Sequence, residues 1–449
     1  MIDWPLFLSD NARIDFWTIA VGIVCNASCA ILGCFLVLRR MSLLGDAISH
    51  SVLAGIGIAF LLTGKTTIVP MLLGALAVGV LTAFLTQTLH SFGKVPEDSS
   101  MGVVFTSLFA LGVIMISQVN VHLDTDCVLF GRLDVVSLDP ITIFGKDVPR
   151  ALQSLVPVFG LTLLFTIAFW KELKISSFDP MLATAMGLSA GLVHYLLMGM
   201  VATVTVASLE AVGAIVVVAM LIVPAATAHL LTDRLSWLIV IAVLVGSISA
   251  IFGCLWARHL NTNAAGMLAV VAGIQFLAAV LLAPTHGIVA KIIHNFGLSM
   301  RIVTEDIVAG MYRLEEKTAT ASSPFQLSRN QCAGLAGGGL KAWLAVRLLR
   351  LRARLAADSG GMVQLTVAGR ELGRSLVRAH RLWETYLDQH FELPHDHLHE
   401  PASRIEHYIG PALQEKLAYE LRGREIDPHG RAIPTFTERT KEQQEPSRE

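Results

Sequence analysis

Long apolar blocks dominate the first two thirds of the chain. A membrane-spanning helix needs about 20 apolar residues. Windows of that kind fall near 16–38, 42–63, 68–89, 101–119, 151–170, 188–206, 209–231, 235–256 and 266–290. They predict nine membrane helices, the seventh kinked at Pro224 and the last interrupted at residues 284–287.

Beyond about residue 300 the pattern changes, because charged residues become frequent and apolar residues recur at helical spacing. We therefore expect a transmembrane domain at 1–300, a linker at 301–330 and a mainly helical domain with a polar tail at 331–449. With 54% hydrophobic and 15% charged residues overall, the chain is too apolar for one soluble fold. The predicted fold class is an all-α polytopic membrane protein with a C-terminal helical domain.

Basic residues near the span ends predict the orientation. One side would carry Arg39, Arg40, Lys94, Lys171, Lys174 and Arg234. We assign this side to the cytoplasm, so the chain is expected in the inner membrane of the cell. Nine spans then place the N-terminus outside and the C-terminal domain in the cytoplasm.

Two ionisable residues open the second apolar window. Asp46 and His50 are four residues apart, which is about one helical turn, so their side chains share a helix face. A carboxylate and an imidazole are ordinary ligands of Mn²⁺, Zn²⁺ or Fe²⁺, and such groups inside a membrane usually mark an ion path. The plainer alternative is a helix end that Asp46 caps, with His50 bonded to a neighbour. His194, Glu210 and His229 are further ionisable groups near span ends, and we leave them out of the metal site.

The loop after the fifth window reads KELKISSFDPMLATAMGLS. Ser177 or Asp179 can cap a short helix, Pro180 suits its first turn and Gly187 can end it. A short helix between two spans is a candidate contact for a soluble partner.

These segments resemble the metal-ion permeases of ATP-binding-cassette importers. The resemblance rests on FLVLRRMSLLGDAISHSVLAGI at 35–56, FDPMLATAMGL at 178–188, HYLLM at 194–198 and LEAVGAIVVVAMLIVPAATAHLL at 209–231. It implies that Asp46 and His50 form a metal site in the permeation path. It also implies that the loop helix inserts into an ATPase subunit, with coupling residues Phe178, Asp179, Pro180, Ala183 and Gly187.

The same resemblance implies the partners: an ABC ATPase, an extracytoplasmic metal-binding protein, and a second permease copy or paralogue, all beside membrane lipid. No GxxxxGK[ST] phosphate loop occurs, so we expect a non-enzymatic permease whose energy comes from a separate subunit. A divalent manganese, zinc or iron ion would be the substrate, with no permanently bound cofactor. A proton-coupled metal transporter is the alternative, because an intramembrane Asp/His pair can also relay protons.

The C-terminal segment is rich in metal-binding residue types. His380 and Glu384 are one turn apart, several histidines follow at 395–399, and Glu406 and His407 come next. Such clusters suit a transition-metal site, although histidine-rich loops also occur as plain surface. Upstream, LKAWLAVRLLRLRARLAADSG is a basic amphipathic segment that suits a membrane surface, a nucleic acid or a solvated face.

GMVQLTVAGRELGRSLVRAHRLWETYL, HLHEPASRIEHYIG and DPHGRAIP resemble the metal-dependent repressors typified by the diphtheria toxin and manganese repressors. The resemblance implies a winged-helix and dimerisation-like domain in which His380, Glu384 and His399 form one metal site, and Glu406 and His407 belong to a second. Ser403 replaces a cysteine or glutamate ligand, and the ligand from the first DNA-binding helix has no clear counterpart. The Gly-rich AGLAGGGLKAW replaces the recognition helix, so DNA is not expected as a partner.

The combined prediction is a divalent-metal permease with a cytosolic domain in which the metal ion could also act as an effector. Metal sensing that slows uptake, simple dimerisation and a membrane-anchored transcriptional regulator remain open as roles of that domain. The identity of the metal and the choice between a homodimeric and a heterodimeric permease also remain open.

Overall fold

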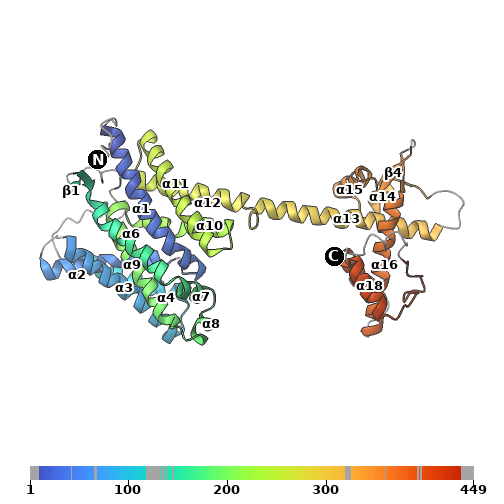
Figure 1. Cartoon of the computed structure of the whole chain (residues 1–449), viewed down its shortest axis with the longest axis horizontal. Coiled ribbons are helices and arrows are strands. Elements are labelled where there is room, and N and C mark those ends of the chain that lie inside the picture. Colours follow the sequence, from blue (N-terminus) through green and yellow to red (C-terminus); the bar gives the residue numbers. More distant parts are fainter. Residues whose placement is uncertain are drawn as a thin grey trace, which may run out of the picture. The chain divides into compact units, whose positions relative to one another are not determined.

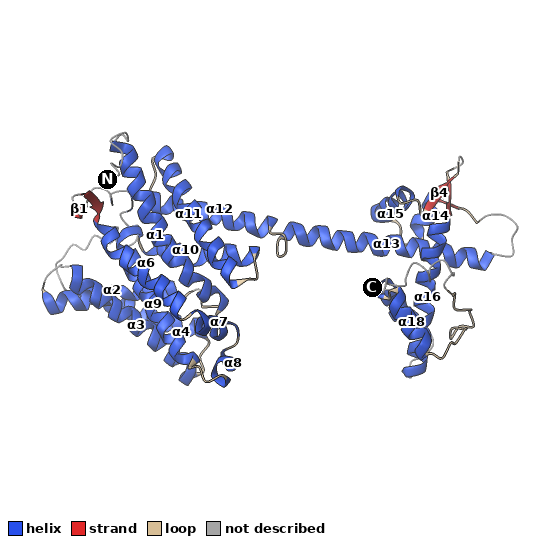
Figure 2. Cartoon of the chain, in the orientation of Figure 1, coloured by secondary structure: helices blue, strands red, loops and turns tan. Residues whose placement is uncertain are grey.

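The computed structural model forms two compact units, residues Met1–Lys291 and Ile292–Glu449, and each is described by itself. Helices dominate both units, and strands are short (Figure 2). The structure describes residues 10–41, 43–64, 68–117, 133, 136, 139–143, 146–318, 325–358, 361–391, 394 and 397–435.

The first unit contains, within these described ranges, nine helices long and apolar enough to cross a membrane, which confirms the predicted number. They are α1 (Asp10–Leu38), α2 (Leu44–Thr63), α3 (Ile68–Gly93), α4 (Glu97–Ser117), α6 (Arg150–Ala168), α9 (Ala190–Val212), α10 (Ala214–Leu231), α11 (Leu235–Leu260) and α12 (Ala264–Leu282) (Figure 1). The antiparallel strands β1 (Pro140–Ile143) and β2 (Lys146–Pro149) precede α6, and α7 (Trp170–Phe178) and α8 (Pro180–Ala185) precede α9.

Two prolines lie where the sequence predicts a change in a membrane helix. Pro224 lies inside α10. The helix α12 ends at Leu282, and the next helix, α13, begins only at Ile288. The last apolar window therefore ends earlier than residue 290, because the segment between the two helices contains Pro284.

Close backbone contacts at glycine hold the first unit together. A Cβ atom added to Gly33 of α1 would lie 1.8 Å from the carbonyl oxygen of Leu221 in α10, and one added to Gly55 of α2 would lie 2.2 Å from that of Gly74 in α3. Lipid tails are as apolar as side chains, so membrane helices gain stability mainly by this kind of close packing. The contact between α2 and α3 fixes the helix that carries Asp46 and His50.

The second unit has the element order of a winged helix followed by further helices. Its elements are α13 (Ile288–Thr318), β3 (Leu327–Ser328), α14 (Arg329–Gly334), α15 (Gly339–Leu351), β4 (Leu355–Ala357), β5 (Met362–Leu365), α16 (Val367–His390), α17 (His399–Ile405), the 3₁₀ turn η3 (Glu406–Tyr408) and α18 (Pro411–Glu420). The three strands form an antiparallel sheet in the order β3-β5-β4. The mainly helical winged-helix class predicted for this region is confirmed.

Two segments differ from the sequence-based description. Residues 301–318, expected within the linker, continue α13, and Ile307, Val308 and Met311 of that helix are buried in the core of the second unit. The Gly-rich segment does not replace a helix, because Gly337 and Gly338 adopt positive φ angles in the turn between α14 and α15, and Gly339 does so as the first residue of α15. Glycine tolerates this backbone region without a steric penalty.

The contact between α1 and α10 predicts a sharp effect of one added methyl group. Gly33→Ala should lower the free energy of unfolding by about 1–3 kcal/mol, because backbone atoms of Leu221 would have to move. The measurement is thermal unfolding of the detergent-purified protein. Gly199→Ala in α9 is the matched control, since a Cβ there meets nothing within 4 Å. Equal stability of the two variants would contradict this account of the packing.

Candidate functional site

The first candidate site lies on α2. Asp46 and His50 stand one turn apart, with Asp46 Oδ1 3.4 Å from His50 Nε2. The imidazole ring contacts Phe105 and Phe109 of α4, at centroid distances of 5.8 and 5.9 Å. The two side chains are 41% and 35% exposed in the single chain. The pair is therefore accessible at the surface of this chain rather than sealed in its core.

The capping alternative for Asp46 is wrong. The cap position of α2 is Leu43, which makes no side-chain cap hydrogen bond. The Asp46 carboxylate instead lies in the first turn, beside His50. Among the described residues, no third His, Cys, Asp or Glu joins the pair. Two donor atoms on one helix face leave most coordination positions of a transition metal open.

The predicted loop helix is α8. Asp179, not Ser177, caps it, because Asp179 Oδ1 accepts a 2.9 Å hydrogen bond from the Leu182 amide. Pro180 occupies the first turn. Gly187 follows the helix at φ +80°, where other residues would be strained.

Apolar side chains on and around α8 point outward. Phe178, Met181 and Met186 are 58%, 84% and 61% exposed, whereas Ala183 is fully buried. A short capped helix with several large exposed apolar side chains is typical of a protein contact surface. Of the expected coupling residues, Phe178 can touch a partner directly, and Asp179, Pro180, Ala183 and Gly187 shape or anchor the helix.

The second unit brings together the first predicted ligand set, here called the first cluster: His380, Glu384 and His399. His380 Nε2 lies 2.9 Å from Glu384 Oε1 and 3.0 Å from His399 Nδ1, and His399 Nδ1 lies 3.0 Å from the same Glu384 oxygen. The first two residues are buried on α16, and His399 begins α17. Three donors converge on one point.

The second cluster consists of Asp306, Glu406 and His407. Glu406 and His407, the two residues expected in a second site, lie in η3, and Asp306 comes from α13. His407 Nε2 lies 3.2 Å from Asp306 Oδ1, and His407 Nδ1 lies 2.9 Å from Glu305 Oε2. The sequence pattern does not identify Asp306 as a ligand, because this residue lies in the segment 301–330 that is expected to be a linker. The amphipathic spacing of residues 300–311 is the signal that could have found it.

One histidine joins the two clusters. His380 Nδ1 lies 2.6 Å from Glu406 Oε2, while its Nε2 belongs to the first cluster. The same Glu406 oxygen accepts a 2.9 Å hydrogen bond from Arg313. Ser403 does not take part, since its hydroxyl donates to the Glu400 carbonyl of its own helix.

The DPHGRAIP motif lies next to the first cluster. His429 Nδ1 is 3.6 Å from Glu384 Oε2. Asp427 Oδ1 accepts hydrogen bonds from the amides of His429 and Arg431, and its other oxygen faces Arg381 at 3.5 Å. Because the carboxylate of Asp427 is already paired, its role is to hold the turn of this motif.

Neighbouring charges and hydrogen bonds set the protonation of both clusters. Burial alone would raise the pKa of Glu384, but the hydrogen bonds with His380 and His399 outweigh it and lower the pKa to about 2. Burial alone would lower the pKa of His407, but Asp306 and Glu305 raise it to about 9. A divalent ion bound to His407 must therefore replace a proton. Mixed imidazole and carboxylate donors fit Mn²⁺, Fe²⁺ or Zn²⁺.

The raised pKa of His407 predicts a pH-dependent stability of the metal-free protein. The protonated imidazole stabilises the fold fully below pH 6.5, and this stabilisation is lost as the pH rises through about 9. Its size is roughly 3 kcal/mol. The unfolding temperature, measured in the presence of a chelator, should fall more steeply between pH 6.5 and 9.5 for the unaltered chain than for His407→Gln. Identical pH profiles would contradict the assigned contacts.

Comparisons with known proteins find a matching family for each of the two parts of the chain. The family model described as "ABC 3 transport family" matches residues 12–283, and that described as "Iron dependent repressor, metal binding and dimerisation domain" matches residues 366–435. The chain is 47% identical over 280 residues to the "Manganese transport system membrane protein MntD" of Bacillus subtilis, which covers 62% of this chain and 95% of the relative.

Two further similarities extend this match. The "Zinc transport system membrane protein TroD" of Treponema pallidum is 35% identical over 363 residues, covering 80% of this chain and 97% of the relative. The solved structure "PsaBC from Streptococcus pneumoniae in complex with Fab" is 32% identical with a TM-score of 0.52, covering 60% of this chain and 92% of that one. The multi-pass chain therefore belongs to the ABC 3 transport family of membrane permeases and carries a C-terminal domain similar to the iron-dependent repressors.

Proposed function

We propose that this chain is the permease subunit of an ATP-driven importer for a divalent transition metal, manganese or zinc in the first place. The observation that carries the proposal is the Asp46/His50 pair on a membrane-length helix, with ligand atoms 3.4 Å apart. Ionisable groups in such a helix are expensive unless they serve transport. The names of the relatives, which are manganese and zinc transport proteins, support this choice of substrate.

A second permease, either a copy or a paralogue, would complete the metal site. The pair offers two donors and is one third or more exposed in the single chain. Apposing the same face of a partner would double the donor set to two carboxylates and two imidazoles, which suits a transition metal. The similar structure from Streptococcus pneumoniae carries the composite name PsaBC, which agrees with a permease that works in an assembly.

An ABC ATPase is the second partner of the proposed importer. The exposed apolar residues around α8 supply a surface for it, and the basic residues at the span ends favour a cytoplasmic position for this face. An extracytoplasmic metal-binding protein would deliver the ion on the other side. With nine spans, the C-terminal domain then also lies in the cytoplasm.

The C-terminal domain would act as a metal sensor for the importer. Its two clusters are composed of the residue types that bind the proposed substrate, and His380 couples them. Metal binding at the second cluster would join α13 to η3, because its donors come from both. A cytosolic site of this kind can reduce uptake only if it binds metal differently in two states of the transporter.

The transport proposal predicts the effect of removing both donors. The double variant Asp46→Ala/His50→Ala should reduce manganese uptake into cells at least tenfold, because the ion loses its ligands within the span. Uptake is measured with the radioactive ion at equal membrane expression. The control is His229→Ala/Asp233→Ala, two exposed residues with the same sequence spacing, of which His229 lies in the last turn of α10 and Asp233 follows the end of that helix. Uptake that survives in the first variant, or that depends on a proton gradient and not on ATP, would refute the proposal.

The sensor proposal predicts a loss of feedback without a loss of transport. His380→Ala should leave the initial rate of uptake unchanged but abolish its slowing after cells are preloaded with metal, since it removes a donor from the first cluster and the contact with Glu406 of the second. His390→Ala, an exposed histidine on the same helix, serves as the comparison. If preloading with metal still slows uptake normally in cells with either variant, the domain has a different role.

A further inference from the structure

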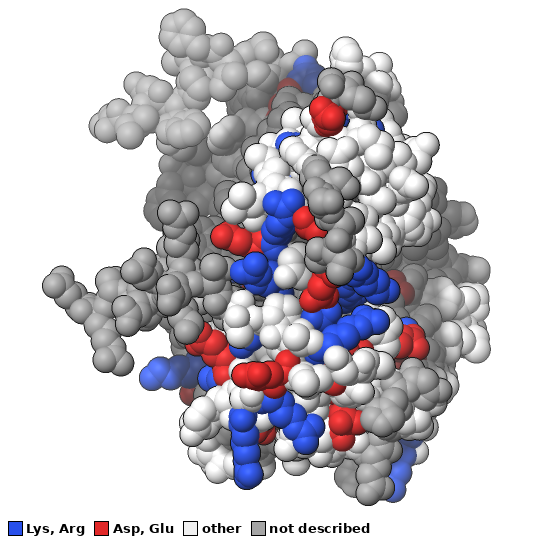
Figure 3. All heavy atoms as spheres, turned by 90° about the vertical axis from the view of Figure 1, so that its right-hand side faces the viewer, with Lys and Arg blue, Asp and Glu red and all other residues white. Residues whose placement is uncertain are grey.

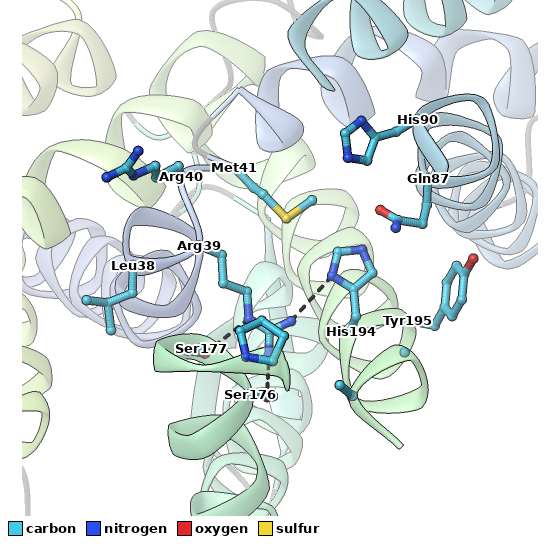
Figure 4. A pocket seen from close by; sticks show the side chains of 13 residues that line it. Leu38, Arg39, Arg40, Met41, Gln87, His90, Ser176, Ser177, His194 and Tyr195 are labelled. Atoms are coloured by element: carbon cyan, nitrogen blue, oxygen red, sulfur yellow. Dashed lines mark hydrogen bonds between the residues drawn. The ribbon is translucent and has the colours of Figure 1, made fainter. Parts of the chain in front are cut away.

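A pocket of about 420 Å³ lies in the first unit, beside the start of α8 (Figure 4). Side chains from the end of α1, from α3, from α7 and from the first turns of α9 line it. None of these described lining residues is acidic, whereas Arg39 and Arg40 are among them. The pocket therefore has a positive lining with no internal carboxylate to balance it.

Within the described part of the chain, the hydrogen bonds of Arg39 go to neutral groups only. Its guanidinium donates hydrogen bonds to Ser177 Oγ at 3.1 Å, to Ser176 Oγ at 2.8 Å and to His194 Nδ1 at 3.3 Å. Burial lowers the pKa of Arg39 to about 10, so the group is partly desolvated and still charged at neutral pH. A partly buried charge that has satisfied hydrogen bonds but no carboxylate partner among the described residues favours binding of an anion.

His194 adds a directed donor. An arginine N–H can only donate, so His194 Nδ1 accepts, and the neutral ring carries its proton on Nε2. His194 Nε2 is buried and has no partner among the described residues. Figure 4 shows the ring between Arg39 and the side chains of Gln87 and His90 of α3. The remaining N–H groups of Arg39 and the ring N–H of His194 suit phosphate oxygens. Arg40, whose side chain extends away from the ring in Figure 4, adds positive charge to the lining, and this charge would repel a metal cation.

The position and size of the pocket favour a lipid headgroup over a small ion. The pocket lies where membrane-length helices end or begin, next to Leu38 at the end of α1 and Ala190 at the start of α9. Its volume exceeds that of a free phosphate, and Leu38 and Met41 give it an apolar side. Basic pockets between membrane helices are known to take anionic headgroups.

We propose that this pocket binds the phosphate headgroup of an anionic phospholipid. The bound headgroup would neutralise Arg39 and tie the end of α1 to α7, whose Ser176 and Ser177 accept hydrogen bonds from the same guanidinium. Pro180, the first residue of α8, also borders the pocket. Given the proposed role of α8 in contacting an ATPase, the lipid would order the segment through which ATP hydrolysis is coupled to transport.

Binding is tested on the purified full-length chain, apart from any transport assay. Short-chain phosphatidylglycerol, phosphatidylcholine of the same chain length and inorganic phosphate are titrated, and binding is followed by native mass spectrometry and thermal stabilisation. Phosphatidylglycerol should bind and stabilise the protein, and phosphatidylcholine should not. Arg39→Gln should weaken phosphatidylglycerol binding at least tenfold and Arg40→Gln about threefold. Arg234→Gln, an exposed arginine at the start of α11, should leave it unchanged.

Arg40→Gln keeps the hydrogen bonds of Arg39 and so tests the charge even if Arg39→Gln fails to fold. Equal binding of both lipids, or equal phosphatidylglycerol binding by all variants, would overturn the proposal. Stabilisation by inorganic phosphate with no added effect of phosphatidylglycerol would assign the pocket to free phosphate instead. Loss of ATPase association by Arg39→Gln with lipid binding intact would show that a partner carboxylate is the anion. None of these results depends on Asp46 or His50, so failure here leaves the transport proposal standing.

Discussion

The close approach of α2 to α3 is the constraint on which the proposed transport site depends. Gly55 and Gly74 allow the two backbones to touch, and α4 also packs against α2, with Phe105 and Phe109 against the His50 ring. A helix held in this way presents Asp46 and His50 in one fixed orientation. Preorganised donors let an ion exchange its water for ligands without a rearrangement of the protein at the moment of binding.

The two units contain the same types of metal ligand, but these ligands are partly exposed in the first unit and mostly buried in the second. In the first unit one carboxylate and one imidazole remain partly exposed and incomplete, which suits a substrate that must enter and leave. In the second unit the donors are mostly buried, and each cluster is complete enough to bring three ligand atoms together. Without metal, the carboxylates of these clusters pair with His380, with His407, whose pKa is raised, and with Arg313. Basic and acidic side chains are interspersed on the face shown in Figure 3, without the continuous basic surface that favours nucleic-acid backbones.

The sequence predicts those features that depend on local pattern. The nine membrane-length helices found among the described residues follow from long apolar windows, and the shared face of His380 and Glu384 follows from a spacing of four residues. Features that depend on distant partners escape such reasoning. Asp306 joins Glu406 and His407 across about a hundred positions, and its helix resembles a polar linker unless the buried face of α13 is recognised. The pocket around Arg39 likewise draws on α1, α3, α7 and α9, so no single window shows it. The partial exposure of Asp46 and His50 is also invisible in the sequence, because it depends on how α2 packs.

The central claim is that the Asp46/His50 pair binds the transported ion directly. Electron spin echo spectroscopy of Mn²⁺ bound to the reconstituted transporter, with His380, His399 and His407 replaced to silence the second unit, tests it most directly. The account predicts a nitrogen coupling from a coordinated imidazole that disappears in His50→Ala. A coupling that persists in that variant, or bound Mn²⁺ with no coordinated nitrogen at all, would contradict it.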